Sequence, residues 1–413
     1  MLRLFYVLAL GYALSSLPYH PETTQPNLHP ANYSFNNKLF AFGLLHSAIR
    51  LDTADRNLLI SPLSLYLSLG ILYNGAGHAT RDSIAQALQS RVDLDNTQLN
   101  IRCKELLQQM PMNDSNVRIA LANSIWCNRR KLVLLPAFEE ISESYYYAPA
   151  QSLNFGSPEA PKIINRWVSQ NTHKKIPTII DRTNPNDRIY LLDAALFNSI
   201  WQSPFAARDN RMGLFYLENG RTEETIFMSQ TLTTHLYSDT AFTMLELPYG
   251  NGKAYSMYVI LPDDPQQPLH NWAAGFTEEK LDQALTQMSV QSVQVQIPSW
   301  EGTYSRDMRA LLTGMGLGIA FNDYDNADFS GMCQQGRGKA CISKVIQKAY
   351  IRVNENGAEI NDQSPAPSNM ENTVTRPHHT VTITADHSFL YFILDKQRNI
   401  VLFTGVMADP RQS

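Results

Sequence analysis

The chain has 413 residues, of which 44% are hydrophobic and 17% charged, and its formal net charge is −4 at pH 7. This is an ordinary globular balance, and the weak negative charge gives no reason to expect nucleic acid or an anionic membrane as a partner. The length does not require two domains, because large mixed cores of sheet and helix reach this size.

The first residues predict an export signal. Arg3 supplies a positive amino end, residues 4–14 form an apolar run, and Ala13 and Ser15 are small residues suited to cleavage. The alternative is a buried first helix, but four helix-breaking prolines follow at once, namely Pro18, Pro21, Pro26 and Pro30. We therefore expect a signal peptide over 1–15, a loose segment over 16–35, and a mature chain that is secreted or periplasmic.

Helices and strands are then mixed along the chain. Ser61 and Pro62 predict a helix start, because serine is a good N-cap and proline fits the first turn. Apolar spacing predicts an amphipathic helix over 160–172, with Ile163, Ile164, Trp167 and Val168 on its apolar stripe. Strands are expected over 120–126, 190–197, 242–247, 255–261, 293–297, 348–353, 380–384, 389–394 and 400–406. The absence of a βαβ rhythm indicates an α+β fold.

Between two of these strands, residues 361–380 are polar and almost free of apolar side chains. They carry Pro365 and Pro367 and cannot join a core, so they are expected to form an exposed loop. A long loop between good strands of a compact domain is usually functional.

The four cysteines permit disulfides in an exported chain, with three possible pairings. Cys333 and Cys341 flank a glycine-containing loop and are the favoured local pair. Four free thiols are the alternative, which the sequence leaves open.

Ten fragments lie in order along nearly the whole mature chain: residues 57–64, 164–168, 175–176, 245–249, 256–262, 327–332, 342–344, 353–359, 385–390 and 402–405. In sequence and in spacing they resemble the serpin family. Each fragment is weak alone, but together they are specific. The resemblance implies one α+β domain over 36–413, with three β-sheets, about eight or nine α-helices and an exposed reactive-centre loop at about 357–380.

The resemblance also implies a metastable, monomeric inhibitor of a serine or cysteine protease, without a cofactor. In inhibitory members the protease cleaves the loop and forms an acyl-enzyme. The loop then inserts as a new strand in the main sheet and traps the protease. The expected partner is therefore a protease, with no nucleic acid and no membrane.

Six residues are expected to form the hinge of this loop: Glu355, Gly357, Ala358, Glu359, Ile360 and Asp362. Strand alternation turns six residues inward, most of them small: Ala358, Ile360, Asp362, Ser364, Ala366 and Ser368. This pattern favours insertion. Three features oppose it. Asp362 would bury a carboxylate, Ile360 is bulky where the inhibitory family has a small residue, and Pro365 and Pro367 lack strand N–H groups. A non-inhibitory carrier, chaperone or protease decoy is therefore the alternative.

The family register places the cleaved bond near Glu371 and Asn372. Met370 and Glu371 are the best candidates for the residue that the protease reads, because Arg376 is followed by Pro377. They imply an elastase-like or acid-preferring protease.

Five residues resemble the region where the family's main sheet opens: Ser61, Ser64, Asp193, Trp201 and Gln347. Asp193 stands where the family usually has asparagine, and Gln347 stands where it usually has histidine. Glutamine can donate to a carboxylate, so the hydrogen bond between the two positions can survive the double change. Core packing and polar satisfaction are the alternative role of all five.

No enzyme is expected, because the chain has no Gly-x-Ser-x-Gly elbow, P-loop or dinucleotide fingerprint. Asp386 and His387 could suggest a catalytic pair, but adjacent strand residues point to opposite faces, so we expect no such hydrogen bond. His378 and His379 are also adjacent and are expected to be loop residues, so no metal site is predicted.

Overall fold

The computed structural model describes residues 37–52, 56–88, 95–110, 114, 116–252, 254–265, 267–322, 326–335, 337–358 and 380–412. The predicted signal peptide, the segment 16–35 and residues 359–379 of the predicted loop lie outside these ranges. Among the described residues, no helix is both long and apolar enough to cross a membrane.

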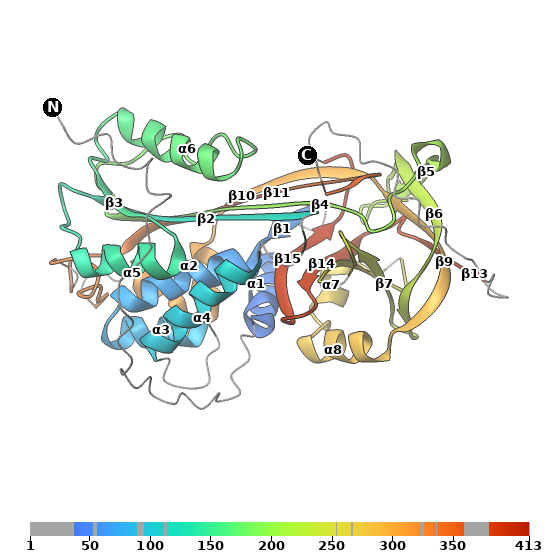
Figure 1. Cartoon of the computed structure of the whole chain (residues 1–413), viewed down its shortest axis with the longest axis horizontal. Coiled ribbons are helices and arrows are strands. Elements are labelled where there is room, and N and C mark those ends of the chain that lie inside the picture. The colour runs from blue at the N-terminus through green and yellow to red at the C-terminus, as the bar shows by residue number, and fades with distance from the viewer. Residues whose placement is uncertain are drawn as a thin grey trace, which may run out of the picture. The chain divides into compact units, whose positions relative to one another are not determined.

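A six-stranded sheet contains the strand that precedes the predicted loop (Figure 1). Its order is β10 (Trp300–Asp307), β11 (Ile342–Asn354), β12 (Gly357–Ala358), β4 (Ile189–Ile200), β2 (Val117–Asn128) and β3 (Ala150–Leu153). β11 is antiparallel to β10 and parallel to β4, so it is an inner strand of the sheet. We call this sheet the main sheet.

The other strands form one hydrogen-bonded network. Its order is β1 (Leu58–Ile60), β15 (Ile400–Met407), β14 (Phe389–Asp395), β8 (Tyr255–Pro262), β7 (Phe242–Pro248), β6 (Thr222–Ser238), β9 (Ser289–Pro298) and β13 (Thr380–Thr384), and β5 (Arg211–Tyr216) pairs with β6. β6 pairs with β9 over ten residues but with β7 over only three. The network is thus two strand sets joined by a short contact, which accounts for the three sheets expected.

The described residues contain ten α-helices. They are α1 (Lys38–Leu51), α2 (Pro62–Gly75), α3 (His78–Ala87), α4 (Asn96–Gln109), α5 (Pro136–Tyr146), α6 (Glu159–Asn171), α7 (Leu269–Ala273), α8 (Glu278–Gln287), α9 (Arg309–Leu312) and α10 (Ile319–Asn322). Three of them have five residues or fewer. As predicted, Ser61 caps α2: its side chain accepts a hydrogen bond from the Ser64 N–H at 3.4 Å, and Pro62 occupies the first turn.

Helix α6 covers the face of the main sheet opposite to α2 and α5 (Figure 1). Ile164 and Val168 are fully buried and share a small core with Trp126 of β2 and Tyr190 of β4. Ile163, expected on the same stripe, is instead 38% exposed. Ile164 and Val168 are four residues apart and lie on one helix face, whereas a neighbouring residue is rotated by about 100°.

The four cysteines are all free and buried, so the favoured Cys333–Cys341 disulfide is absent and the free-thiol alternative holds. Both residues lie in the main core, where a free cysteine packs as a small apolar side chain. Burial raises the pKa of the Cys333 thiol to about 11, so it is an inert thiol at neutral pH.

Candidate functional site

The predicted hinge begins inside the main sheet. One edge of β12 pairs with Val353 and Asn354 of β11, and the other edge pairs with Ser199 and Ile200 of β4. The direct parallel pairing of β11 with β4 runs only as far as Tyr350. The two strands therefore separate beyond this point, and the first two strand residues of the hinge fill the gap.

Gly357 allows the backbone of the hinge to pack closely against the backbone of β4. Its φ is +142°, and a Cβ at this position would lie 2.1 Å from the Ser199 carbonyl oxygen and 2.7 Å from the Ile200 Cα. Only glycine tolerates both the backbone angle and the contact. The next residue, Ala358, is fully buried in the main core, so its side chain points inward as the alternation predicted.

The turn before β12 is held by hydrogen bonds from both sides. The Asn354 Oδ1 atom accepts from the Asn356 N–H at 3.0 Å. The Glu355 carbonyl accepts from the Phe205 N–H at 2.9 Å, and its carboxylate accepts from Asn210 Nδ2 at 2.5 Å. The hinge turn is therefore anchored to the segment that follows β4.

Trp201, predicted to lie where the sheet opens, contacts the same turn. Its Nε1–H donates to the Asn354 carbonyl at 2.8 Å, and its backbone N–H donates to the Asn356 carbonyl at 2.8 Å. The indole stacks on Tyr249 with ring centroids 4.3 Å apart. Tryptophan thus supplies both a stacking surface and a donor that a phenyl ring lacks.

Further along the sheet, β11 and β4 are joined by a buried polar network. Gln347 and Asp193 are register partners on the two strands, and Gln347 Nε2 donates to Asp193 Oδ2 at 2.9 Å. Gln347 also donates to the Ser61 carbonyl at 2.9 Å and accepts from the Ser61 N–H at 3.0 Å. The hydrogen bond expected between positions 193 and 347 is therefore present, and it links two strands to the start of α2.

The Ser64 hydroxyl indicates that Asp193 carries a proton. Its oxygen lies 2.5 Å from Asp193 Oδ1 and 2.7 Å from Asn123 Oδ1, yet one hydroxyl proton cannot serve both acceptors. If Asp193 is protonated, it donates to Ser64, which in turn donates to Asn123. Burial agrees, since it raises the pKa of Asp193 to about 7, although Ser64 and Gln347 can donate to the ionised carboxylate and so lower the pKa.

Sequence reasoning missed Asn123, which completes this network. Its Nδ2 donates to the Ser64 carbonyl at 3.0 Å from the middle of β2. The available signal was a polar pair, Asn123 and Ser124, inside the otherwise apolar run 119–127. Such a residue in a buried strand needs a hydrogen-bond partner, although the pattern does not say which one.

The expectation about Asp386 and His387 is wrong. His387 Nδ1 lies 3.0 Å from Asp386 Oδ1, because the two residues fall between β13 and β14, where strand alternation does not apply. The other ring nitrogen lies 3.2 Å from the Pro262 carbonyl, so the imidazole is fully occupied. Six predicted site residues lie outside the described ranges: Glu359, Ile360, Asp362, Met370, Glu371 and Asn372.

Known proteins resemble this chain in sequence along most of its length. The family model for serpin (serine protease inhibitor) matches residues 35–410. Serpin-Z4 of Hordeum vulgare is 30% identical over 376 residues, which cover 87% of this chain and 91% of that protein. Serpin B6 of Macaca fascicularis is 28% identical over 382 residues, covering 91% and 98%.

Solved structures share the fold. The native thermophilic serpin tengpin superposes with a TM-score of 0.83 at 24% identity and covers 94% of this chain and 96% of its own. Human thyroxine-binding globulin superposes with a TM-score of 0.80 at 23% identity, covering 91% and 97%. The architecture around the main sheet is therefore one that known proteins have.

Proposed function

The chain belongs to the serpin family, and on this premise we propose that it is a suicide-type inhibitor of a serine or cysteine protease, acting by cleavage and insertion of its reactive loop. The main support is β12: the first strand residues of the hinge already lie between β11 and β4. β11 is an inner strand with β10 on its other side, so a strand that continues β12 would have a partner on each edge.

Insertion would be favoured by the strand directions. β12 is antiparallel to both of its neighbours, whereas β11 and β4 are parallel to each other. Continuing β12 would replace one parallel pairing with two antiparallel ones, and antiparallel pairing is slightly more stable per residue. The number of ladder hydrogen bonds would also rise. This gain is the driving force that the proposed trapping step uses.

Continuing the register also identifies what insertion would break. Each step along the loop moves one residue back along both neighbours. Ser364 would then lie between Gln347 and Asp193, whose side chains are hydrogen-bonded across the strands. Insertion of the loop would therefore have to break the hydrogen bond between Gln347 and Asp193.

We propose that the protease partner is elastase-like or acid-preferring and that it recognises Met370 or Glu371 next to the cleaved bond. We expect a covalent, denaturant-resistant complex when the mature protein is incubated with an elastase-like enzyme. Chymotrypsin-, trypsin- and papain-like enzymes test the specificity. Clean loop cleavage by all four without any such complex would exclude inhibition of these classes. A large rise in melting temperature after nicking measures insertion separately.

Asp362 supplies a sharper test. In the continued register it would lie between Ala349 and Ala195, both fully buried. Burying a carboxylate there would cost on the order of several kcal/mol, and about 1.4 kcal/mol in the insertion barrier slows insertion tenfold. We expect Asp362→Ala to increase the ratio of trapped complex to cleaved, untrapped chain at least about tenfold, while Asn361→Ala, on the outward face, changes this ratio little. Equal effects of the two substitutions on gel-resolved complex would contradict this register.

The second candidate is a non-inhibitory carrier, chaperone or protease decoy, which Ile360, Asp362, Pro365 and Pro367 favour. It predicts complete cleavage without trapping, for the wild type and for Asp362→Ala alike. Together the two substitutions and the four proteases separate the candidates.

We also propose that the chain is exported. When the full chain is expressed in a secreting cell, the protein recovered outside the cytoplasm should begin near Ser15 or Ser16 by amino-terminal sequencing. Recovery only inside the cell with an intact amino terminus would overturn this.

A further inference from the structure

Four large apolar side chains are exposed together on the outer face of two neighbouring strands, β5 and β6. Met212 and Ile226 are register partners, so their Cβ atoms lie about 5 Å apart. Leu214 and Tyr216 follow Met212 at alternate positions of β5, each about 7 Å further along the strand. The exposed fractions are 65% for Met212, 46% for Leu214, 51% for Tyr216 and 44% for Ile226. We call these four residues the apolar patch.

β5 is held in place by its inner face rather than by the apolar patch. Phe215 alternates with the patch residues along the strand and is fully buried in the main core. On an outer face that meets only water, polar side chains are expected. Single exposed apolar residues are common, but a contiguous group bordered by charges is typical of an interaction site. Arg211 and Glu224 form such a border, since both are exposed and lie next to patch residues along β5 and across on β6.

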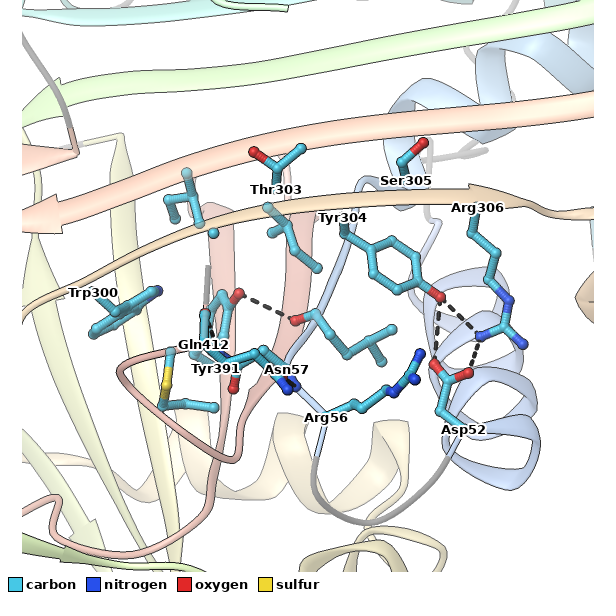
Figure 2. A pocket seen from close by; sticks show the side chains of 15 residues that line it. Asp52, Arg56, Asn57, Trp300, Thr303, Tyr304, Ser305, Arg306, Tyr391 and Gln412 are labelled. Atoms are coloured by element: carbon cyan, nitrogen blue, oxygen red, sulfur yellow. Dashed lines mark hydrogen bonds and ion pairs between the residues drawn. The ribbon is translucent and has the colours of Figure 1, made fainter. Parts of the chain in front are cut away.

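The cavity beside β10 offers a partner much less apolar surface. Trp300 and Tyr391 line this space of about 590 Å³ (Figure 2), but the two residues are only 5% and 2% exposed. A partner contacts a side chain only through its accessible surface, so these rings cannot anchor one. The apolar patch, by contrast, is open to a partner along its whole length.

The apolar patch begins beside the hinge of the reactive loop. Asn210, two residues before Met212, donates from Nδ2 to the Glu355 carboxylate at 2.5 Å. The Glu355 carbonyl also accepts from the Phe205 N–H at 2.9 Å. The start of β5 is therefore tied to the turn that leads into β12 and the reactive loop.

The other end of β5 contacts the chain that follows the loop. The Tyr216 N–H donates to the Asp386 carbonyl at 2.7 Å, and Tyr216 pairs with His387 in an isolated parallel bridge. β13, which ends at Thr384, belongs to the same sheet as β5 through β9 and β6 (Figure 1). Segments on both sides of the reactive loop thus meet the strand that carries most of the patch.

A protease that cleaves the loop lies within reach of the patch. Thr380, where β13 begins, is level with Thr233 of β6 through Ser292 of β9, and Thr233 is seven residues from Ile226. With two strand spacings across the sheet, Thr380 and Ile226 are about 25 Å apart. A standard protein–protein interface covers about 800 Å² on each partner, or about 30 Å across. An enzyme whose active-site cleft holds the loop can therefore also contact the patch.

We propose that the apolar patch is a second docking surface for the target protease, which contacts the patch while the loop occupies its active-site cleft. The inference rests on the proposed function only in requiring that a protease cleaves the loop, and trapping is not needed. Because an apolar side chain gains free energy against an apolar surface, the matching part of the enzyme is an apolar rim beside its cleft. Met212 is the most exposed of the four residues, and methionine adapts its shape to an irregular partner surface.

Binding to an enzyme that cannot cleave tests the patch directly. The probe is an elastase-like protease whose catalytic serine is replaced by alanine, titrated with the full chain. Met212→Ser combined with Leu214→Ser should raise the dissociation constant at least about tenfold, which corresponds to about 1.4 kcal/mol. Ile226→Thr keeps a β-branched residue in the strand, so the fold is retained, and it should raise the dissociation constant by a smaller factor.

Val133→Ser is the matched control. Val133 is 47% exposed, close to the exposed fraction of Leu214. It lies just beyond the end of β2, where Cys127 pairs with Ile189. The hinge pairs with Ile200, eleven residues away along β4, or about 36 Å. The dissociation constant of this variant should stay within about twofold of the wild-type value.

Cleavage of the same variants by the active enzyme separates this proposal from inhibition. If the patch variants lower kcat/KM for loop cleavage at least about tenfold without any trapped complex, only inhibition fails. If none of the four protease classes cleaves the loop, both proposals are contradicted. The docking proposal alone is overturned if the double variant and Ile226→Thr bind and are cleaved like Val133→Ser. It is also overturned if the patch variants abolish self-association of the chain and leave protease binding unchanged, because the patch then contacts a second copy.

Discussion

Replacing Asp193 with asparagine should raise the free energy of unfolding at pH 8 by about 4 kcal/mol relative to the wild type, with no gain below about pH 4. The reason is burial, which raises the pKa of this carboxyl from 3.8 to about 7 in the folded protein. Between these two pH values the unfolded chain has lost the proton and the folded chain keeps it. The wild type therefore loses stability as pH rises through this window, and the loss is complete above about pH 7.

Asparagine mimics the protonated carboxyl. Its Nδ2–H can donate to the Ser64 hydroxyl, which lies 2.5 Å from Asp193 Oδ1, and its oxygen can accept from Gln347. The variant keeps the network without a group that titrates. Denaturant unfolding of both proteins from pH 4 to pH 8 measures the difference. Asp209→Asn, at a position where the side chain is half exposed, is the control and should change the free energy of unfolding little. A pH-independent difference for Asp193→Asn would mean that Asp193 is not protonated in the folded protein.

Replacing Gly357 with alanine should lower the free energy of unfolding by at least about 2 kcal/mol and release β12 from its place between β11 and β4. The positive φ of +142° is strained for any residue with a Cβ. The added methyl group would also meet the backbone of β4, with the Ser199 oxygen at 2.1 Å. A backbone atom in a paired strand cannot move aside as the end of a flexible side chain can.

Gly302→Ala is the matched control for this experiment, because its Cβ would meet nothing within 4 Å. Its stability should stay near that of the wild type. Hydrogen exchange of the amides at 357 and 358 provides a second readout, since both residues pair with neighbouring strands. Should Gly357→Ala be as stable and as protected as Gly302→Ala, the hinge does not lie between the two strands in solution.

The sequence alone determined the features that depend on neighbouring residues. Ser61 and Pro62 mark the start of α2, and apolar runs marked β4, β8 and β14, because capping and strand preference act within a few residues. The family fragments then indicated the fold and the hinge glycine. Gln347 and Asp193 were also paired correctly, but by resemblance rather than by local pattern.

Only the tertiary structure decided the chemistry of these positions. Asn123 completes the network from another strand, and its presence beside Ser64 is what indicates a protonated Asp193. A pKa is set by groups that are distant in sequence and brought together by packing, so no local pattern contains it.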